Sequence, residues 1–178
     1  MRPFLLLTLL SVAAAATACS NDITGSAMRS DEISARNDGG AADGSRTVPF
    51  KAHYNASIVG VGTGPGCDAR LFLEGAGTGT HLGNFTVSLS FCGRADGTLD
   101  TGTGTFVAAN GDLLYITFNG VSDGGHPVLH FTSYVTFTGG TGRFEGATGT
   151  ATVNGIFDAT TGSGPADWNG TITFASGS

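Results

Sequence analysis

This sequence of 178 residues is poor in charge, and above all in positive charge. Charged residues make up 12% of the chain, Lys51 is the only lysine, and the net charge is −6. A nucleic-acid-binding surface needs a basic patch to hold phosphates, so we expect no nucleic-acid partner. Hydrophobic residues nevertheless make up 40% of the chain, which excludes a disordered acidic tail protein.

The motifs of metal, nucleotide and hydrolase chemistry are also missing. The few cysteines and histidines form no Cys-x-x-Cys pair and no cluster at metal-ligand spacing. There is no G-x-S-x-G nucleophile motif, and the glycine-rich stretch 139–149 lacks the Lys-Ser/Thr ending of a phosphate-binding loop. We therefore expect no metal and no cofactor, and we assign no catalytic residue.

The apolar run 4–16 is too short to stay in a bilayer as a spanning helix. It follows Arg2 and leads into Ala16-Thr17-Ala18 and then Cys19, a pattern typical of a bacterial lipoprotein signal peptide with the lipid on Cys19. Such signals usually carry Leu where Ala16 stands. The alternative is cleavage by ordinary signal peptidase, which leaves a soluble secreted protein with a free Cys19 thiol.

These features predict the compartment and the division of the chain. We expect a protein of the bacterial cell envelope, anchored at the outer membrane or exported to the periplasm or surface, that contacts the membrane only through its lipid. Residues 1–18 are the expected signal peptide. Residues 19–46 have few large apolar side chains and predict a flexible tether. Residues 47–178 are the expected folded domain.

What the chain has in abundance is glycine, 30 residues of it, between short segments of alternating apolar and polar residues. Alternation with a period of two predicts β-strands, and glycine-rich clusters predict the turns between them. The expected strands are 48–60, 67–77, 81–92, 98–108, 112–121, 127–138, 147–158 and 167–175. No long crossover connects them, so an eight-stranded antiparallel up-and-down β-barrel is the predicted fold.

Two hairpins can be placed in register from the sequence. Asn110-Gly111 favours a two-residue type I′ turn, which pairs Ala109 with Asp112. If Cys19 carries lipid, Cys67 and Cys92 remain as an even pair, and an exported protein favours a disulfide between them. If these two cysteines lie directly opposite each other, the turn falls at Gly79-Thr80, which suits a type II′ hairpin.

That second register predicts a ligand site. It places Arg70 and Glu74 on the same face as the large apolar residues Phe85, Val87, Leu89 and Phe91. If this face looks into the barrel, an Arg70–Glu74 pair could orient a ligand there. Leu71 and Leu73 would then lie on the outer wall and favour a homo-oligomer. The alternative is a β-bulge near Gly75 that turns both charges to solvent.

Three segments resemble a known group of proteins. They are THLGNFT (80–86), AANGD (108–112) and FTGGTGRFEGATG (137–149). Together they resemble bacterial secreted proteins of the allene oxide cyclase-like barrel group, and the last also resembles a stretch of plant dirigent proteins. The resemblance covers about 48–176 and implies an eight-stranded antiparallel barrel, often oligomeric, with a cavity for a small apolar substrate. Within the last segment, the glycines predict a tight corner, with Phe144 closing the barrel end.

Three functions remain open at this point. The first is a lipid-anchored envelope protein whose barrel binds a small apolar ligand, or has a structural role, without turnover. The second is a cyclase or isomerase that uses the cavity as a shaped chamber and needs few catalytic groups. The third is a protein-interaction module that uses the outer wall. We expect the first, so the protein is not expected to be an enzyme.

Overall fold

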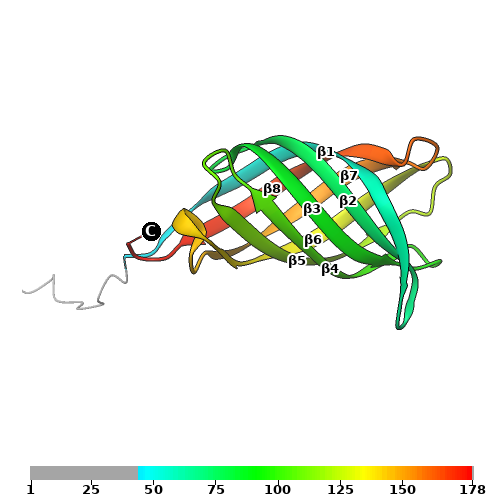
Figure 1. Cartoon of the computed structure of the whole chain (residues 1–178), viewed down its shortest axis with the longest axis horizontal. Helices are drawn as coiled ribbons and strands as arrows, with labels where there is room; N and C mark the ends of the chain where they lie inside the picture. Colours follow the sequence, from blue (N-terminus) through cyan, green and yellow to red (C-terminus); the bar gives the residue numbers. More distant parts are fainter. Residues whose placement is uncertain (1–43, 178) are drawn as a thin grey trace, which may run out of the picture. The chain divides into compact units, whose positions relative to one another are not determined.

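The computed structural model describes residues 44–177, apart from the side chain of Thr101. These residues form a closed barrel of eight antiparallel strands, as predicted (Figure 1). The strands are β1 (Arg46–Gly64), β2 (Cys67–Gly79), β3 (Gly83–Gly93), β4 (Thr98–Val107), β5 (Leu113–Ser122), β6 (Val128–Gly140), β7 (Thr148–Asp158) and β8 (Ser163–Phe174). The lipidation site predicted at Cys19, the signal peptide and nearly all of the tether lie outside the described residues.

The alternation seen in the sequence becomes the inner and outer faces of the barrel wall. Along β1, Phe50, Ala52, Tyr54 and Ala56 are buried while the residues between them are exposed. Successive side chains of a strand point to opposite faces, so every second residue fills the interior. β1 pairs with both β2 and β8, which closes the ring and leaves no unpaired edge among the described strands.

The Asn110-Gly111 hairpin forms, but not with the predicted two-residue turn. Val107 pairs with Leu113, and the Ala108 N–H donates to the Asp112 carbonyl oxygen at 2.9 Å. Residues 109–111 therefore make a longer loop in which Gly111 takes the left-handed backbone conformation at φ +89°. The Asn110 side-chain oxygen accepts from the Asp112 N–H at 3.2 Å, which stabilises this wider loop.

The register predicted between β2 and β3 is wrong by an odd number of residues. Gly79 pairs with Gly83 and Arg70 pairs with Cys92, because the loop takes in residues 80–82. Thr80 is held by β1 instead of closing a tight turn: its N–H donates to the Lys51 carbonyl oxygen at 2.8 Å. An odd shift exchanges the two faces of a strand, so β2 presents to the interior the face that was expected outside.

The predicted Cys67–Cys92 disulfide is confirmed, with Cα atoms 5.4 Å apart. It does not join directly opposed residues, since the ladder partner of Cys92 is Arg70. Cys67 is instead the first residue of β2, and the bond connects that start to the end of β3. The disulfide therefore holds together two strands at the end of the barrel that also carries the β3–β4 connection.

The opposite end of the barrel is filled. A short 3-10 helix, η1 (Gly142–Phe144), lies there between β6 and β7, near the C-terminal end of β8 (Figure 1). Phe144 is fully buried, as the glycine-rich segment predicted, and its ring lies 6.0 Å from that of Phe174. Other fully buried side chains in the interior are Phe50, Leu82, Phe106, Leu114 and Ile172. Between residues 44 and 177 no helix is long and apolar enough to cross a membrane.

Candidate functional site

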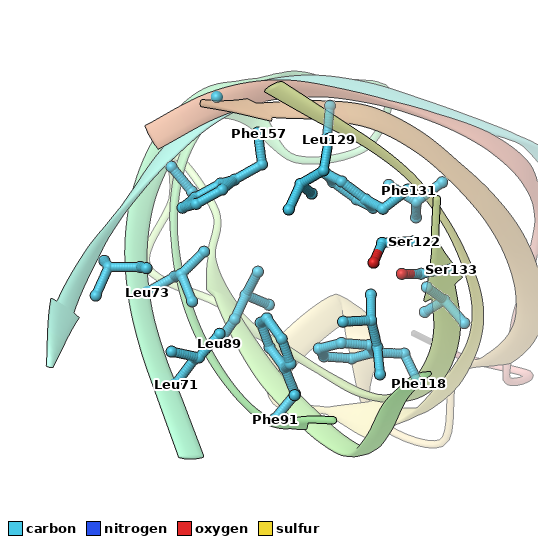
Figure 2. Close-up of a pocket in the computed structure, with 18 of the residues that line it drawn as sticks. Leu71, Leu73, Leu89, Phe91, Phe118, Ser122, Leu129, Phe131, Ser133 and Phe157 are labelled. Atoms are coloured by element: carbon cyan, nitrogen blue, oxygen red, sulfur yellow. The ribbon is translucent and has the colours of Figure 1, made fainter. Parts of the chain in front are cut away.

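The half of the barrel away from η1 is hollow. A cavity of about 220 Å³ lies there, lined by inward-facing residues of all eight strands. Figure 2 shows Leu71, Leu73 and Leu89 on one side of it, with Phe91, Phe118, Phe131 and Phe157 around the rest. The two ends of the barrel therefore differ, because one is packed solid and the other encloses an apolar chamber.

Small side chains on β1 and β8 create this space. Ala56 pairs with Gly164, and Tyr54 pairs with Ala166, so a patch of wall contributes almost no volume to the interior. Ala56, Gly164 and Ala166 all line the cavity. An apolar void of this kind leaves its lining atoms without dispersion partners, which a ligand of the right shape supplies.

Trp168 of β8 joins the cavity to the filled half. It lines the cavity and is only 4% exposed. Its ring lies 5.2 Å from the Phe106 ring, 6.2 Å from the Phe50 ring and 6.1 Å from the Tyr54 ring. These tilted and edge-on aromatic contacts hold the indole in place, so it forms a rigid part of the wall.

Few polar groups reach this chamber, and they come from opposite parts of the wall. Tyr54 is on β1, beside Trp168, and Ser133 is on β6. Figure 2 shows the hydroxyls of Ser122 and Ser133 directed toward the same part of the cavity. The Ser122 hydroxyl donates to the Gly97 carbonyl oxygen at 3.3 Å, whereas the buried Ser133 hydroxyl makes no hydrogen bond within residues 44–177.

Burial controls the protonation of Tyr54. It raises the pKa of the phenol to about 12, and the neighbouring Trp168 N–H acts in the opposite direction but is the smaller of the two effects. Tyr54 is therefore a neutral hydrogen-bond donor at any physiological pH. The Trp168 N–H is itself buried and makes no well-aligned hydrogen bond within the described chain. Both groups can donate, and neither carries charge.

An ion pair joins the β3–β4 connection to β4 beside the cavity. Arg94 lines the cavity, and its guanidinium donates to the Asp100 carboxylate at 2.9 and 3.2 Å. Both side chains are about 40% exposed, at 41% and 39%, so solvent screens the pair. Arg94 is the one residue of the lining whose side chain carries a permanent charge.

The site predicted at Arg70 and Glu74 does not form inside the barrel. Glu74 is exposed and pairs with Ser88, in a shallow groove on the outer wall that Phe72 also lines. Arg70 is half-buried, donates to the Ser90 hydroxyl at 3.5 Å, and does not line the cavity. The odd register shift is the reason, and it also moves Leu71 and Leu73, expected outside, into the cavity wall.

The described histidines do not form a metal site. His53 Nδ1 lies 2.8 Å from the Asp167 carboxylate on the outer wall, where both side chains are largely exposed. No group of three or more potential metal ligands occurs in residues 44–177. Sequence reasoning missed Tyr54 and Ser133 as cavity residues. The signal that could have found them is a polar residue at an inward position of an alternating strand.

Comparison with known proteins supports the architecture. No protein-family model matches this chain, and no curated protein matches it. Among solved structures, the pterocarpan synthase dirigent protein GePTS1 is similar, with a TM-score of 0.51 and 15% sequence identity. The match covers 75% of this chain and 93% of that one. At this identity the likeness concerns the fold alone, and the chain has a dirigent-like β-barrel fold.

Proposed function

We propose that this protein binds a small apolar molecule inside its barrel, without turnover, while attached to the bacterial cell envelope by a lipid on Cys19. The observation that carries the binding role is the apolar cavity of about 220 Å³ in an otherwise densely filled barrel. Its volume is below the roughly 300–1,000 Å³ of pockets for drug-sized ligands. The expected ligand is therefore small, with one or two rings or a short chain.

The anchoring part of the proposal depends on the N-terminal sequence. Cys19 follows the small residues Ala16-Thr17-Ala18 at the end of an apolar segment. The polar, glycine- and serine-containing residues 20–45 then precede the first strand and provide a spacer between lipid and barrel. Ser20, and not Asp, follows the cysteine, which favours the outer membrane as the destination.

The binding role is tested by narrowing the cavity. The chain has a single tryptophan, and Trp168 lies in the cavity wall, so its fluorescence reports on a bound molecule. We expect indane, a compact two-ring hydrocarbon, to change this fluorescence with saturation. Ile58 of β1 also lines the cavity, so Ile58→Phe adds volume inside it and should abolish the change. Val59→Phe is the matched control, since Val59 is the next residue and is 59% exposed on the outer wall.

The anchoring role is tested separately. Cys19→Ser should move the protein from the membrane fraction to the soluble fraction, and the native protein should carry an acyl mass increment. A Cys19→Ser protein that stays in the membrane fraction would overturn the anchor. If Ile58→Phe binds indane with the same fluorescence change and affinity as the unaltered protein, the cavity is not the binding site.

A second candidate function is a chamber that folds a flexible substrate for cyclisation or isomerisation. The observation that favours it is the neutral Tyr54 hydroxyl beside Trp168 in a rigid apolar wall, a donor able to stabilise a developing negative oxygen. Turnover would distinguish it from simple binding, because a binder returns its ligand unchanged.

Association through the outer wall is a third candidate role. Val59, Val61 and Phe72 are exposed on β1 and β2 at 59%, 66% and 42%. In a homo-oligomer these side chains would pack against the same side chains of a second copy of the chain. The Leu71 and Leu73 side chains, which the register expected from the sequence puts on the outer wall, face inward instead. Sedimentation velocity that finds only a monomer at high concentration would exclude a homo-oligomer.

A further inference from the structure

The polar groups of the cavity have a common chemical character. Tyr54, Trp168 and Ser133 each carry a hydrogen that can be donated, and a tryptophan N–H can only donate. The Trp168 N–H is fully buried without a well-aligned partner, whereas the Ser133 hydroxyl borders the cavity, where a bound molecule can reach it. A polar group at a cavity wall without a partner is costly, so a bound molecule that accepts from the Ser133 hydroxyl gains affinity.

These donors lie in the wall of an apolar chamber whose one charged lining residue, Arg94, is already paired with Asp100. Tyr54 and Trp168 come from the neighbouring strands β1 and β8, beside the aromatic packing that fills the other half of the barrel. Ser133 is on β6, which β7 and β8 separate from β1 around the ring. A molecule that occupies the chamber thus meets donors from two sides of the wall.

The charge distribution decides what the buried end of such a molecule can be. Of the residues that line the cavity, only Arg94 carries a permanent charge, and its guanidinium already binds Asp100. A carboxylate or an ammonium group beside Tyr54 would have no counter-charge and would lose its hydration. A neutral oxygen can accept from a tyrosine or serine hydroxyl without that cost.

We propose that the cavity selects uncharged molecules that carry a hydrogen-bond acceptor, a carbonyl or an ether oxygen, at the end that lies against Tyr54. Tyr54 is the main donor to this oxygen. The Trp168 ring packs against the Tyr54 ring and holds the phenol in place, and the Ser133 hydroxyl donates the second hydrogen bond. This inference rests on the proposed function, because it specifies the ligand of the same cavity. It predicts that the cavity distinguishes molecules of nearly the same shape by whether they carry a neutral acceptor oxygen.

The test uses two probes of similar shape, indane and 1-indanone, which differ in one carbonyl oxygen. Each is titrated into the unaltered protein, Tyr54→Phe and Ser133→Ala, and binding is followed by Trp168 fluorescence and by calorimetry. Tyr54→Phe should weaken 1-indanone about three- to tenfold, the worth of one neutral hydrogen bond, and should change indane less than about twofold. Ser133→Ala should act in the same direction. Indane-1-carboxylate should bind more weakly than 1-indanone at pH 7.

The outcomes separate this inference from the proposed function. If both probes bind the unaltered protein, and both variants leave the two affinities within about twofold, the cavity binds apolar molecules but does not recognise an acceptor. Tighter binding of the carboxylate would also overturn the inference. If neither indane nor 1-indanone binds the unaltered protein, the binding function itself fails. Unaltered circular dichroism of Ser133→Ala keeps the test informative if Tyr54→Phe does not fold.

Discussion

The carboxylate of Asp112 accepts a hydrogen bond from the backbone N–H of Arg143, at 3.2 Å, and so joins the β4–β5 loop to the η1 turn. The same carboxylate accepts from the Asn110 side-chain amide at 2.7 Å. The Asn110 amide first, and the Arg143 N–H second, hold the pKa of Asp112 below its usual range. Two of the three connections at the filled end of the barrel, β4–β5 and β6–β7, are thus linked through one ionised group.

This linkage predicts a loss of stability in acid. A carboxyl group whose pKa is lowered by folding contributes stability above its unfolded pKa of about 4, and the contribution is lost as pH falls through the folded value. Asp112→Asn should therefore lower the free energy of unfolding at pH 7, and the difference from the unaltered protein should shrink at pH 3. Urea unfolding at both pH values measures this. An equal difference at pH 7 and pH 3 would contradict it.

Phe144 should be the most costly single truncation at the filled end. Its ring is fully buried and lies 6.0 Å from Phe174, with the Arg143 guanidinium 5.1 Å from its centre. Phe144→Ala should reduce the free energy of unfolding by about 3–5 kcal/mol in urea titrations. The control is Phe72→Ala on the outer wall, where the ring is 42% exposed. A loss for Phe72→Ala as large as for Phe144→Ala would show that the interior is misassigned.

The disulfide should stabilise the barrel mainly by restricting the unfolded chain. Cys67 and Cys92 are 25 residues apart, and closing a loop of that length contributes about 3.5 kcal/mol in the chain-entropy model. The double variant Cys67→Ala/Cys92→Ala should lose about that much relative to the oxidised protein. Addition of a reductant should destabilise the unaltered protein and leave the double variant unchanged. A reductant effect on the variant would point to another cause.

Two adjacent residues of β2 test which of its faces is inside. Leu73 is buried and lines the cavity, so Leu73→Ala should cost about 2 kcal/mol, the low end for a buried leucine, because the void beside it already limits its contacts. Glu74 is exposed, so Glu74→Ala should change stability by less than about 0.5 kcal/mol. Thermal and urea unfolding of the pair provide the comparison. A larger loss of stability for Glu74→Ala than for Leu73→Ala would indicate that Glu74, and not Leu73, faces the interior.

Much of the architecture follows from short-range patterns in the chain. The period-two alternation places Phe50, Ala52 and Tyr54 on one face of a strand whatever the strand pairs with. The glycine-rich segment before Phe144 predicts a corner and a plug, and both are present. β1 and β8 differ most from the expected strand limits, each by four residues at one end: β1 continues to Gly64, and β8 begins at Ser163. Pro165, which lies between the expected strands, therefore pairs with Asn55 within β8.

The face assignments fail where they depend on loop length. A two-residue turn at Gly79-Thr80 and the longer loop 80–82 differ in register by an odd number, which exchanges the inner and outer faces of β2. The deciding contact is between Thr80 and Lys51, which are far apart in the sequence. The local sequence predicts an interior position for Arg70 and Glu74 because nothing in their own segment reveals that contact.

The sequence by itself determines the number of strands, their antiparallel order, the disulfide partners and the plug, since each depends on local alternation, glycine turns or residue counting. Only the tertiary structure decides the registers and the cavity. Whether Ala56, Gly164 and Ala166 lie at one height and leave a void depends on how tilted strands slide past one another when the barrel closes. That sliding is set by side-chain contacts between segments distant in the chain, which no local pattern records.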